Sequence, residues 1–267
     1  MRSTMERHPV AAFFILSCAF SWILWGLMIA SQRGVLPFAF PVHWSGSFGP
    51  FFGAVVTAAA LGGGRGVRGL LGPVFRARFG LRWYLFAVAG CLVLFAAALA
   101  IYIALGRSVA SETMAIRNGL ARLPFYYAVI FFVGGPLGEE IGWRGFALPR
   151  LLERRGRLGA SLLVAAMWFA WHVPLFWLEG AAQKGSSIPV FAVLVAANAV
   201  VFTWVYLGSG GSLLSVLLLH TSINTWSYLF AESAPALDAD PLLGRLTAAV
   251  FAVFAAVLAV RWRRGPV

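Results

Sequence analysis

Long runs of apolar residues alternate with short polar connections along this chain. Most runs approach the roughly 17 to 25 residues that an α-helix needs to cross about 30 Å of hydrocarbon. They predict about eight membrane-spanning helices, or seven if one of the interrupted runs does not span, because the second, fourth and seventh contain Gly, Pro or polar residues. The predicted spans cover residues 9–30, 47–62, 83–105, 123–140, 160–178, 188–207, 213–230 and 242–260.

The composition agrees with this pattern. Apolar residues make up 61% of the chain and charged residues 11%, and the mean hydropathy is +0.84, which is outside the range of soluble globular domains. We therefore expect an all-α fold, a polytopic integral membrane helical bundle. Residues 1–267 are expected to form a single membrane-embedded domain, whose polar motifs all lie within 123–230.

Basic residues are distributed unevenly between the two sides of the predicted bundle. With eight spans and a cytoplasmic N-terminus, 15 Lys and Arg residues fall on inside segments and five on outside segments, as the positive-inside rule requires. Both termini are thus predicted to be cytoplasmic. The formal net charge of +12 is divided among membrane edges, so we expect a lipid bilayer and no nucleic acid as its partner. The basic segment 65–82 fits either an amphipathic segment at the interface or an ordinary loop.

Ionisable groups inside predicted spans carry most of the functional information. Placing one at the centre of a span costs roughly 2.5 to 3.5 kcal/mol even on lenient insertion scales, so such residues indicate a functional site. The polar residues in question are Glu139, Glu140, Arg144, His172, His220 and Asn224.

Helical spacing divides these residues into different tasks. Glu140 and Arg144 are four residues apart and share a helix face, where they can form an ion pair. Glu139 is rotated by about 100° from that face, which leaves its carboxylate free for chemistry. His220 and Asn224 are also four apart, so we expect both side chains to point toward the same spot. Depth along the helices predicts that these groups meet His172 in one cavity open to the cytoplasm.

Glycines precede and follow the two glutamates at a spacing of four residues. Gly134, Gly138 and Gly142 form one face on a regular helix, so a neighbouring helix could approach closely there. Pro136 interrupts that face, and local flexibility is the alternative interpretation.

Three short motifs on three predicted helices resemble the CPBP family of intramembrane endopeptidases, which includes type II CAAX prenyl proteases and bacterial proteins of bacteriocin processing and immunity. The family pattern is E-E-x-x-x-R, then F-x-x-x-H, then H-x-x-x-N or H-x-x-x-D. The chain has the first motif in "EEIGWR" and the third in "HTSIN". The second motif departs from the pattern, because Trp168 stands four residues before His172 and the phenylalanine follows at Phe169. The stretch "FGPFFGA" from Phe48 also resembles an early Gly-Pro segment of the family.

The resemblance implies an intramembrane peptidase, which is a hydrolase. We expect no cofactor, with a divalent metal such as zinc as the alternative. Glu139 and His172 would activate a water molecule, His220 and Asn224 would stabilise the oxyanion, and Glu140 with Arg144 would brace the site. The implied substrate is a membrane-associated peptide or protein, either prenylated or bearing a leader. We expect a multi-pass protein of a bacterial inner (plasma) membrane.

Other interpretations remain open at this point. Two His and one Glu are also a ligand set for hydrolytic zinc, but the chain has no H-E-x-x-H motif, and an Asn one turn after a His suits an oxyanion donor better. We therefore favour glutamate-type hydrolysis without a metal over a metal-dependent version. A transporter would also use Glu and His in the membrane, although no pair of similar halves is apparent. A non-catalytic immunity or scaffold protein is the last alternative.

Overall fold

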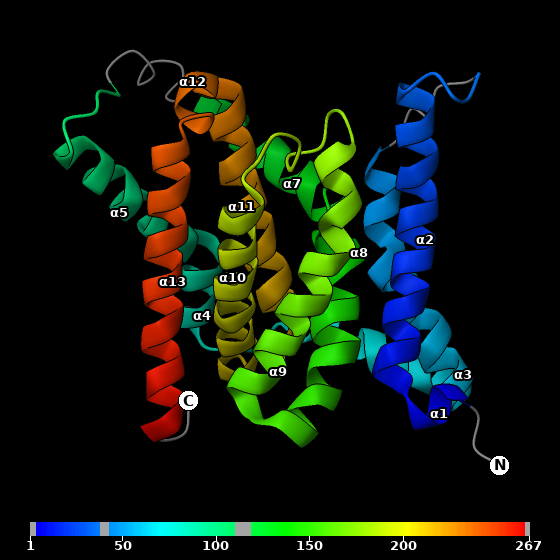
Figure 1. The fold of residues 1–267 in the computed structure, drawn as a ribbon. Coiled ribbons are helices and arrows are strands. Elements are labelled where there is room, and N and C mark those ends of the chain that lie inside the picture. Colours follow the sequence, from blue (N-terminus) through cyan, green and yellow to red (C-terminus); the bar gives the residue numbers. More distant parts are fainter. Residues whose placement is uncertain (1–3, 38–42, 110–118, 265–267) are drawn as a thin grey trace.

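The computed structural model describes residues 4–37, 43–109 and 119–264, and its regular elements there are all helices (Figure 1). Arg2 and Arg117, which enter the count of basic residues, lie outside this part. In chain order the elements are α1 (Thr4–Arg7), α2 (Pro9–Gln32), η1 (His43–Phe48), α3 (Gly49–Leu71), η2 (Gly72–Phe75), α4 (Leu81–Leu85), η3 (Phe86–Gly90), α5 (Cys91–Ala104), η4 (Leu120–Arg122), α7 (Leu123–Val133), α8 (Pro136–Glu140), η5 (Ile141–Ala147), α9 (Leu148–His172), η6 (Val173–Trp177), α10 (Ile188–Gly208), α11 (Leu213–Ser233), α12 (Pro235–Asp238) and α13 (Pro241–Arg264).

The described residues contain seven helical segments that are long and apolar enough to cross a membrane. Six of these segments correspond one to one with predicted spans. The remaining segment, Leu120–Trp177, is 58 residues long and contains the predicted fourth and fifth spans. It is broken at Gly156, where φ is +64° and the chain turns back at the end of the bundle that also holds α1 and the last turns of α13 (Figure 1). The predicted all-α, polytopic membrane bundle is confirmed.

The helix that contains the end of the predicted fourth span continues beyond residue 140. The helix stops after α7 and restarts at Pro136, after Gly135 with φ +108°. It then continues through the π-helical segment η5 into α9, as far as Gly156. Polar residues interrupt the apolar run at this point, but Glu140 and Arg144 are completely buried. Arg144 therefore lies inside the bundle, not on the cytoplasmic segment to which the basic-residue count assigned it.

Part of the basic segment 65–82 is helical. Helix α3 continues to Leu71 beyond a kink at Gly63, where φ is +57°. After the kink, Leu70 is buried while Arg65 and Arg68 are exposed. This arrangement favours the amphipathic interface segment over the ordinary loop for residues 64–71.

Tryptophan side chains connect helix α2 to the helices of the predicted site through ring contacts and hydrogen bonds. The indole of Trp171 packs against Trp25 with ring centroids 4.8 Å apart and against Trp143 at 6.0 Å. Its Nε1 donates to the hydroxyl of Ser21 at 2.7 Å, and Trp22 Nε1 donates to the Trp171 carbonyl at 3.0 Å. These contacts join α2, η5 and α9 into one core next to the two glutamates.

Close approach at the glycine face is present at two of its three positions. A Cβ at Gly138 would lie 2.5 Å from the Ser47 carbonyl oxygen, and a Cβ at Gly142 would lie 2.5 Å from that of Pro50. Gly134 approaches its own helix at Ile130 instead. The Gly-Pro segment that begins α3 is therefore packed directly on the helix that carries the glutamates.

Candidate functional site

The predicted site residues come from α8, η5, α9 and α11, and they form one connected cluster. Most of this cluster is shielded from solvent: Glu139 and His220 are each 5% exposed and His172 is 7% exposed. Asn224 is half-buried. Burial makes the hydrogen-bond partners of these groups decisive, because a buried polar group without a partner destabilises the fold.

Glu139 is held by one of its two carboxylate oxygens. The indole Nε1 of Trp168 donates to Glu139 Oε2 at 2.6 Å. The other oxygen, Oε1, lies against the backbone of Gly135, where a Cβ would be 2.6 Å from it and 3.8 Å from Asn224 Nδ2. Glycine is needed here both for this space and for the φ of +108°. One oxygen is thus fixed while the other lies near the amide of Asn224.

His172 is oriented by the backbone of its own helix. Its Nδ1 lies 2.7 Å from the carbonyl oxygen of Trp168, and because a carbonyl only accepts, Nδ1 carries the proton of this bond. In the neutral imidazole Nε2 then keeps its lone pair and can accept a proton. The ring also packs edge-on against Trp171 and Phe191, with centroids 4.7 and 5.2 Å away.

Glu140 is the anchor of a second, fully buried group. Arg144 NH1 donates to Glu140 Oε1 at 2.9 Å, which is the predicted i,i+4 ion pair. His220 Nδ1 donates to the same oxygen at 2.8 Å. The Arg144 guanidinium also lies over two aromatic rings, 4.5 Å from the centroid of Trp168 and 4.4 Å from that of Phe202.

His220 and Asn224 share a face of α11, as their spacing predicts, but their hydrogen bonds go to different partners. His220 bonds Glu140, whereas Asn224 Nδ2 donates to the Gly134 carbonyl at 3.2 Å. The Gly134–Gly135 break exposes that carbonyl by ending α7, so a nearby amide can bond it. Asn224 consequently lies beside Glu139, while His220 lies beside Glu140.

The sequence did not reveal the role of Trp168 as the centre of the cluster. It contacts Glu139 through its N–H and His172 through its carbonyl, and its ring centroid lies 5.6 Å from that of His220. Only its place in the second motif marked it, as a departure from the family pattern. Among the described residues no three His, Cys, Asp or Glu side chains are arranged to hold a metal ion.

A comparison with protein families covers this same region. Residues 121–226 match the family model described as type II CAAX prenyl endopeptidase Rce1-like. A relative named CAAX prenyl protease 2, from Methanococcus maripaludis, is 30% identical over 99 residues, which are 35% of this chain and 36% of the relative. The match thus spans about a third of the length of that curated relative. Over residues 121–226 the chain is thus similar to the type II CAAX prenyl endopeptidases.

Proposed function

We propose that this chain is an intramembrane endopeptidase that hydrolyses a peptide bond of a membrane-associated polypeptide. The observation that carries the proposal is the buried Glu139 carboxylate, with one oxygen held by Trp168 and the other lying near Asn224. His172 is bonded to the same tryptophan and retains a free ring nitrogen. A carboxylate and an imidazole in one buried cluster are the groups that general-base catalysis with water requires.

In this proposal Glu139 removes a proton from water with the help of His172, and the water oxygen attacks the carbonyl carbon of the scissile bond. The carbonyl oxygen becomes an oxyanion, which the His220 ring and the Asn224 amide stabilise. When the C–N bond breaks, the proton on Glu139 passes to the departing amine. Each oxyanion donor of this kind is typically worth about 3 to 4 kcal/mol in the barrier. No cofactor takes part in these steps.

Glu140 and Arg144 would not touch the substrate. Their ion pair and the Glu140–His220 bond would hold the His220 ring with its Nδ1 proton directed at Glu140. To stabilise the oxyanion, His220 must also carry a proton on Nε2, because a lone pair cannot donate a hydrogen bond. This separation gives the two adjacent glutamates different tasks.

The substrate class follows from the setting and from the relative's name. A site between helices that are apolar enough to span a membrane receives polypeptides held at that membrane. The relative is named a prenyl protease, so we propose a prenylated C-terminal segment as the first substrate to test, with a leader-bearing peptide as the second. We further propose that both termini lie on the cytoplasmic side, from the distribution of basic residues, and that the membrane is a bacterial plasma membrane.

The test is cleavage by purified protein reconstituted into liposomes. Wild type, Glu139→Gln and the matched control Glu179→Gln would be given a prenylated C-terminal peptide, the same peptide without its prenyl group, and a leader peptide. Glu179 suits the control because its side chain is 63% exposed in an ion pair with Lys184. General-base catalysis contributes about 10²- to 10⁴-fold, so Glu139→Gln should lose at least that much of kcat while Glu179→Gln keeps it.

A second experiment requires no choice of substrate. It compares the termini of membrane proteins in cells that carry wild type with those in cells that carry Glu139→Gln. New termini that depend on Glu139 would identify the substrate directly. Identical termini at equal protein abundance, together with no cleavage in liposomes, would contradict the peptidase and favour a scaffold, immunity or transport role.

A further inference from the structure

A groove rich in arginine lies at the end of the bundle where α9 turns back. It separates the start of α2 from the two arms of α9 and has a volume of about 530 Å³, within the range of sites for small ligands. We call it the basic groove and define it by its cationic residues, Arg7, Arg150, Arg154 and Arg155. Glu153 is the one carboxylate among the lining residues, so positive charge dominates.

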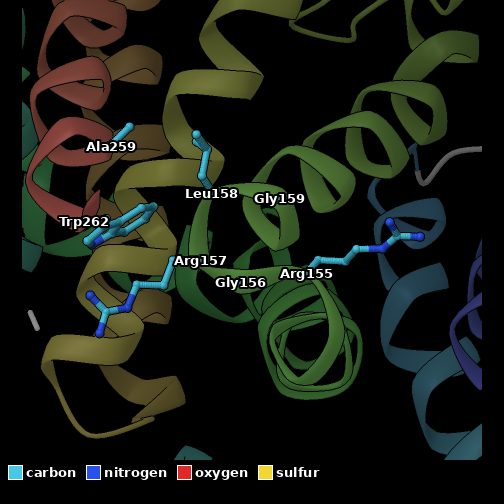
Figure 2. A pocket seen from close by; sticks show the side chains of 7 residues that line it. All are labelled: Arg155, Gly156, Arg157, Leu158, Gly159, Ala259 and Trp262. Atoms are coloured by element: carbon cyan, nitrogen blue, oxygen red, sulfur yellow. The ribbon is translucent and has the colours of Figure 1, made fainter. Parts of the chain in front are cut away.

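The guanidinium groups of the basic groove are available to an anion. Within the described chain Arg7, Arg154 and Arg155 are exposed, and none of the three forms an ion pair with another described residue. A neighbouring hollow has a volume of about 350 Å³. Figure 2 shows its lining residues, with Arg155 directed away from Arg157 and Trp262. Arg155 thus reaches toward the groove that it lines together with Arg7.

Arg150 differs from these three because it is already fixed. Its NH1 donates to the Phe146 carbonyl at 2.8 Å, and its guanidinium carbon lies 3.8 Å from the Phe146 ring centroid. The groove therefore has one cation in a set position, in addition to the three exposed arginines. This arrangement suits an anion with several oxygens, such as a phosphate.

Apolar side chains line another part of the groove. Val10, Leu151 and Leu163 line it, and Leu163 is 40% exposed. Helix α2 begins its candidate span at Pro9, beside the arginines, so the charged part lies where lipid headgroups would be and the apolar part points along the span. A free phosphate ion would use only the charged part, whereas a phospholipid would use both.

We propose that the basic groove binds the phosphate group of an anionic phospholipid, with an acyl chain lying along Val10 and Leu163. Phosphate recognition by clustered arginines between membrane helices has a sound physical basis. The lipid would connect the start of α2 to the turn of α9. The first arm of α9 continues η5 and α8, which carries Glu139, and the second arm ends at His172.

The test measures binding of phosphatidylglycerol with a fluorophore on one acyl chain, to purified protein in dodecyl maltoside micelles. The test variant is Arg7→Gln, Arg154→Gln and Arg155→Gln together. The matched control is Arg65→Gln, Arg68→Gln and Arg78→Gln, which removes the same charge from the other basic segment. Each arginine near an anionic headgroup is worth about 1 kcal/mol, so we expect the groove variant to bind roughly a hundredfold more weakly and the control to bind within threefold of wild type.

Two outcomes would overturn the lipid site. Equal weakening in both triple variants would show diffuse attraction to the net charge, and displacement of the labelled lipid by millimolar inorganic phosphate would show a free-phosphate site. If the triple variant fails to accumulate, Arg155→Gln alone carries the test, with about a fivefold weakening expected.

A second inference comes from Trp168 and is independent of the groove. The family pattern has phenylalanine at this position, and phenylalanine has no hydrogen to donate. Here the indole N–H lies 2.6 Å from Glu139 Oε2, and both side chains are 5% exposed. A hydrogen bond to a buried carboxylate is short and strong, so it selects one rotamer of the glutamate.

We infer that Trp168 is a positioning residue, whose N–H holds Glu139 with Oε1 turned toward Gly135 and Asn224. This inference rests on the proposed function of Glu139 as the base. The rest of the indole is held independently, because its ring lies under the Arg144 guanidinium and against Phe202, with ring centroids 5.7 Å apart. The N–H can therefore be removed while the packing is kept.

The test replaces Trp168 with β-(3-benzothienyl)alanine, which has a sulfur in place of the N–H, and also with phenylalanine. We expect kcat to fall about 10- to 100-fold and KM to stay within twofold, since substrate contacts are unchanged. Unaltered kcat in the benzothienyl protein would overturn the inference.

A spectroscopic measurement separates this inference from the proposed function. In protein labelled with ¹⁵N at its indoles, the Trp168 N–H resonance, assigned by its loss in Trp168→Phe, should lie downfield and move upfield in Glu139→Ala. If the resonance moves in Glu139→Ala but the wild-type protein cleaves no substrate, the hydrogen bond is supported and the proposed peptidase activity is rejected. If the chemical shift is the same in wild type and Glu139→Ala, the hydrogen bond between Trp168 and Glu139 is rejected, whether or not the protein is active.

Discussion

Replacing Glu140 with leucine should destabilise the protein severely, because the buried Arg144 guanidinium would lose its ion-pair partner. Glu140 and Arg144 have no solvent exposure, and NH1 and Oε1 are 2.9 Å apart. Arg144 Nε and NH2 already lack partners among the described residues, so Glu140 provides the one ion pair of this guanidinium. Removing one member of a buried pair costs about 3 to 5 kcal/mol, and we expect Glu140→Leu to lower the free energy of unfolding by that amount.

The companion variant tests the cause of that loss. In Glu140→Leu with Arg144→Met the stranded charge is gone, and methionine can fill the space between the rings of Trp168 and Phe202. His220 still loses its acceptor, which costs about 1 to 3 kcal/mol. The double variant should therefore be more stable than Glu140→Leu alone by about 2 kcal/mol.

Unfolding in mixed micelles with increasing dodecyl sulfate, followed by far-ultraviolet circular dichroism, measures both differences. Arg65→Met, at an exposed site after the α3 kink, controls for the loss of one charge and should change the free energy by less than about 0.5 kcal/mol. A loss below about 1 kcal/mol in Glu140→Leu, or a double variant as unstable as the sum of the two single ones, would refute the reasoning.

Three further predictions follow from the site. Gly135→Ala should reduce kcat at least tenfold, because a Cβ would lie 2.6 Å from Glu139 Oε1 at φ +108°; Gly34→Ala, also at positive φ but in open space, is the matched control for backbone strain. Gly142→Val should lower the free energy of unfolding by about 1 to 3 kcal/mol, since its side chain would meet the Pro50 carbonyl, while Gly62→Val in open space should not. Cleavage should persist in EDTA and in 1,10-phenanthroline; loss that zinc restores would establish the metal-dependent alternative.

The membrane spans were predictable because each depends on one local property, the length of an apolar run. The fourth span shows where that property fails. Its helix continues through Glu139, Glu140 and Arg144, and hydropathy treats these residues as the end of a run. Their burial is compensated by partners that lie far away in sequence, such as His220 at a separation of 80 residues. No window along the chain contains that information.

The candidate site divides in the same way. The Glu140–Arg144 contact follows from helix periodicity, and the structure contains it. The hydrogen bond from Trp168 to Glu139 joins residues 29 positions apart in sequence. It also depends on the break at Gly134–Gly135, after which the helix restarts at Pro136 in a new direction. A tryptophan four residues before a histidine predicts packing against the ring, but its N–H partner depends on how two helices meet.

Adjacent glutamates with different partners resolve a conflict between stability and chemistry. A carboxylate that accepts strong hydrogen bonds from a cation is well stabilised in a buried site but is a weakened base, since its lone pairs are engaged. Glu140 is in that state, with Arg144 and His220 on a single oxygen. Glu139 has a neutral indole donor on one oxygen, so its other oxygen is not neutralised by a cation. Glu139 also lies in the first turn of the helix that begins at Pro136, where the helix dipole favours negative charge. The fold can therefore hold an unpaired carboxylate in the membrane because its neighbour, one residue along, carries the ion pair.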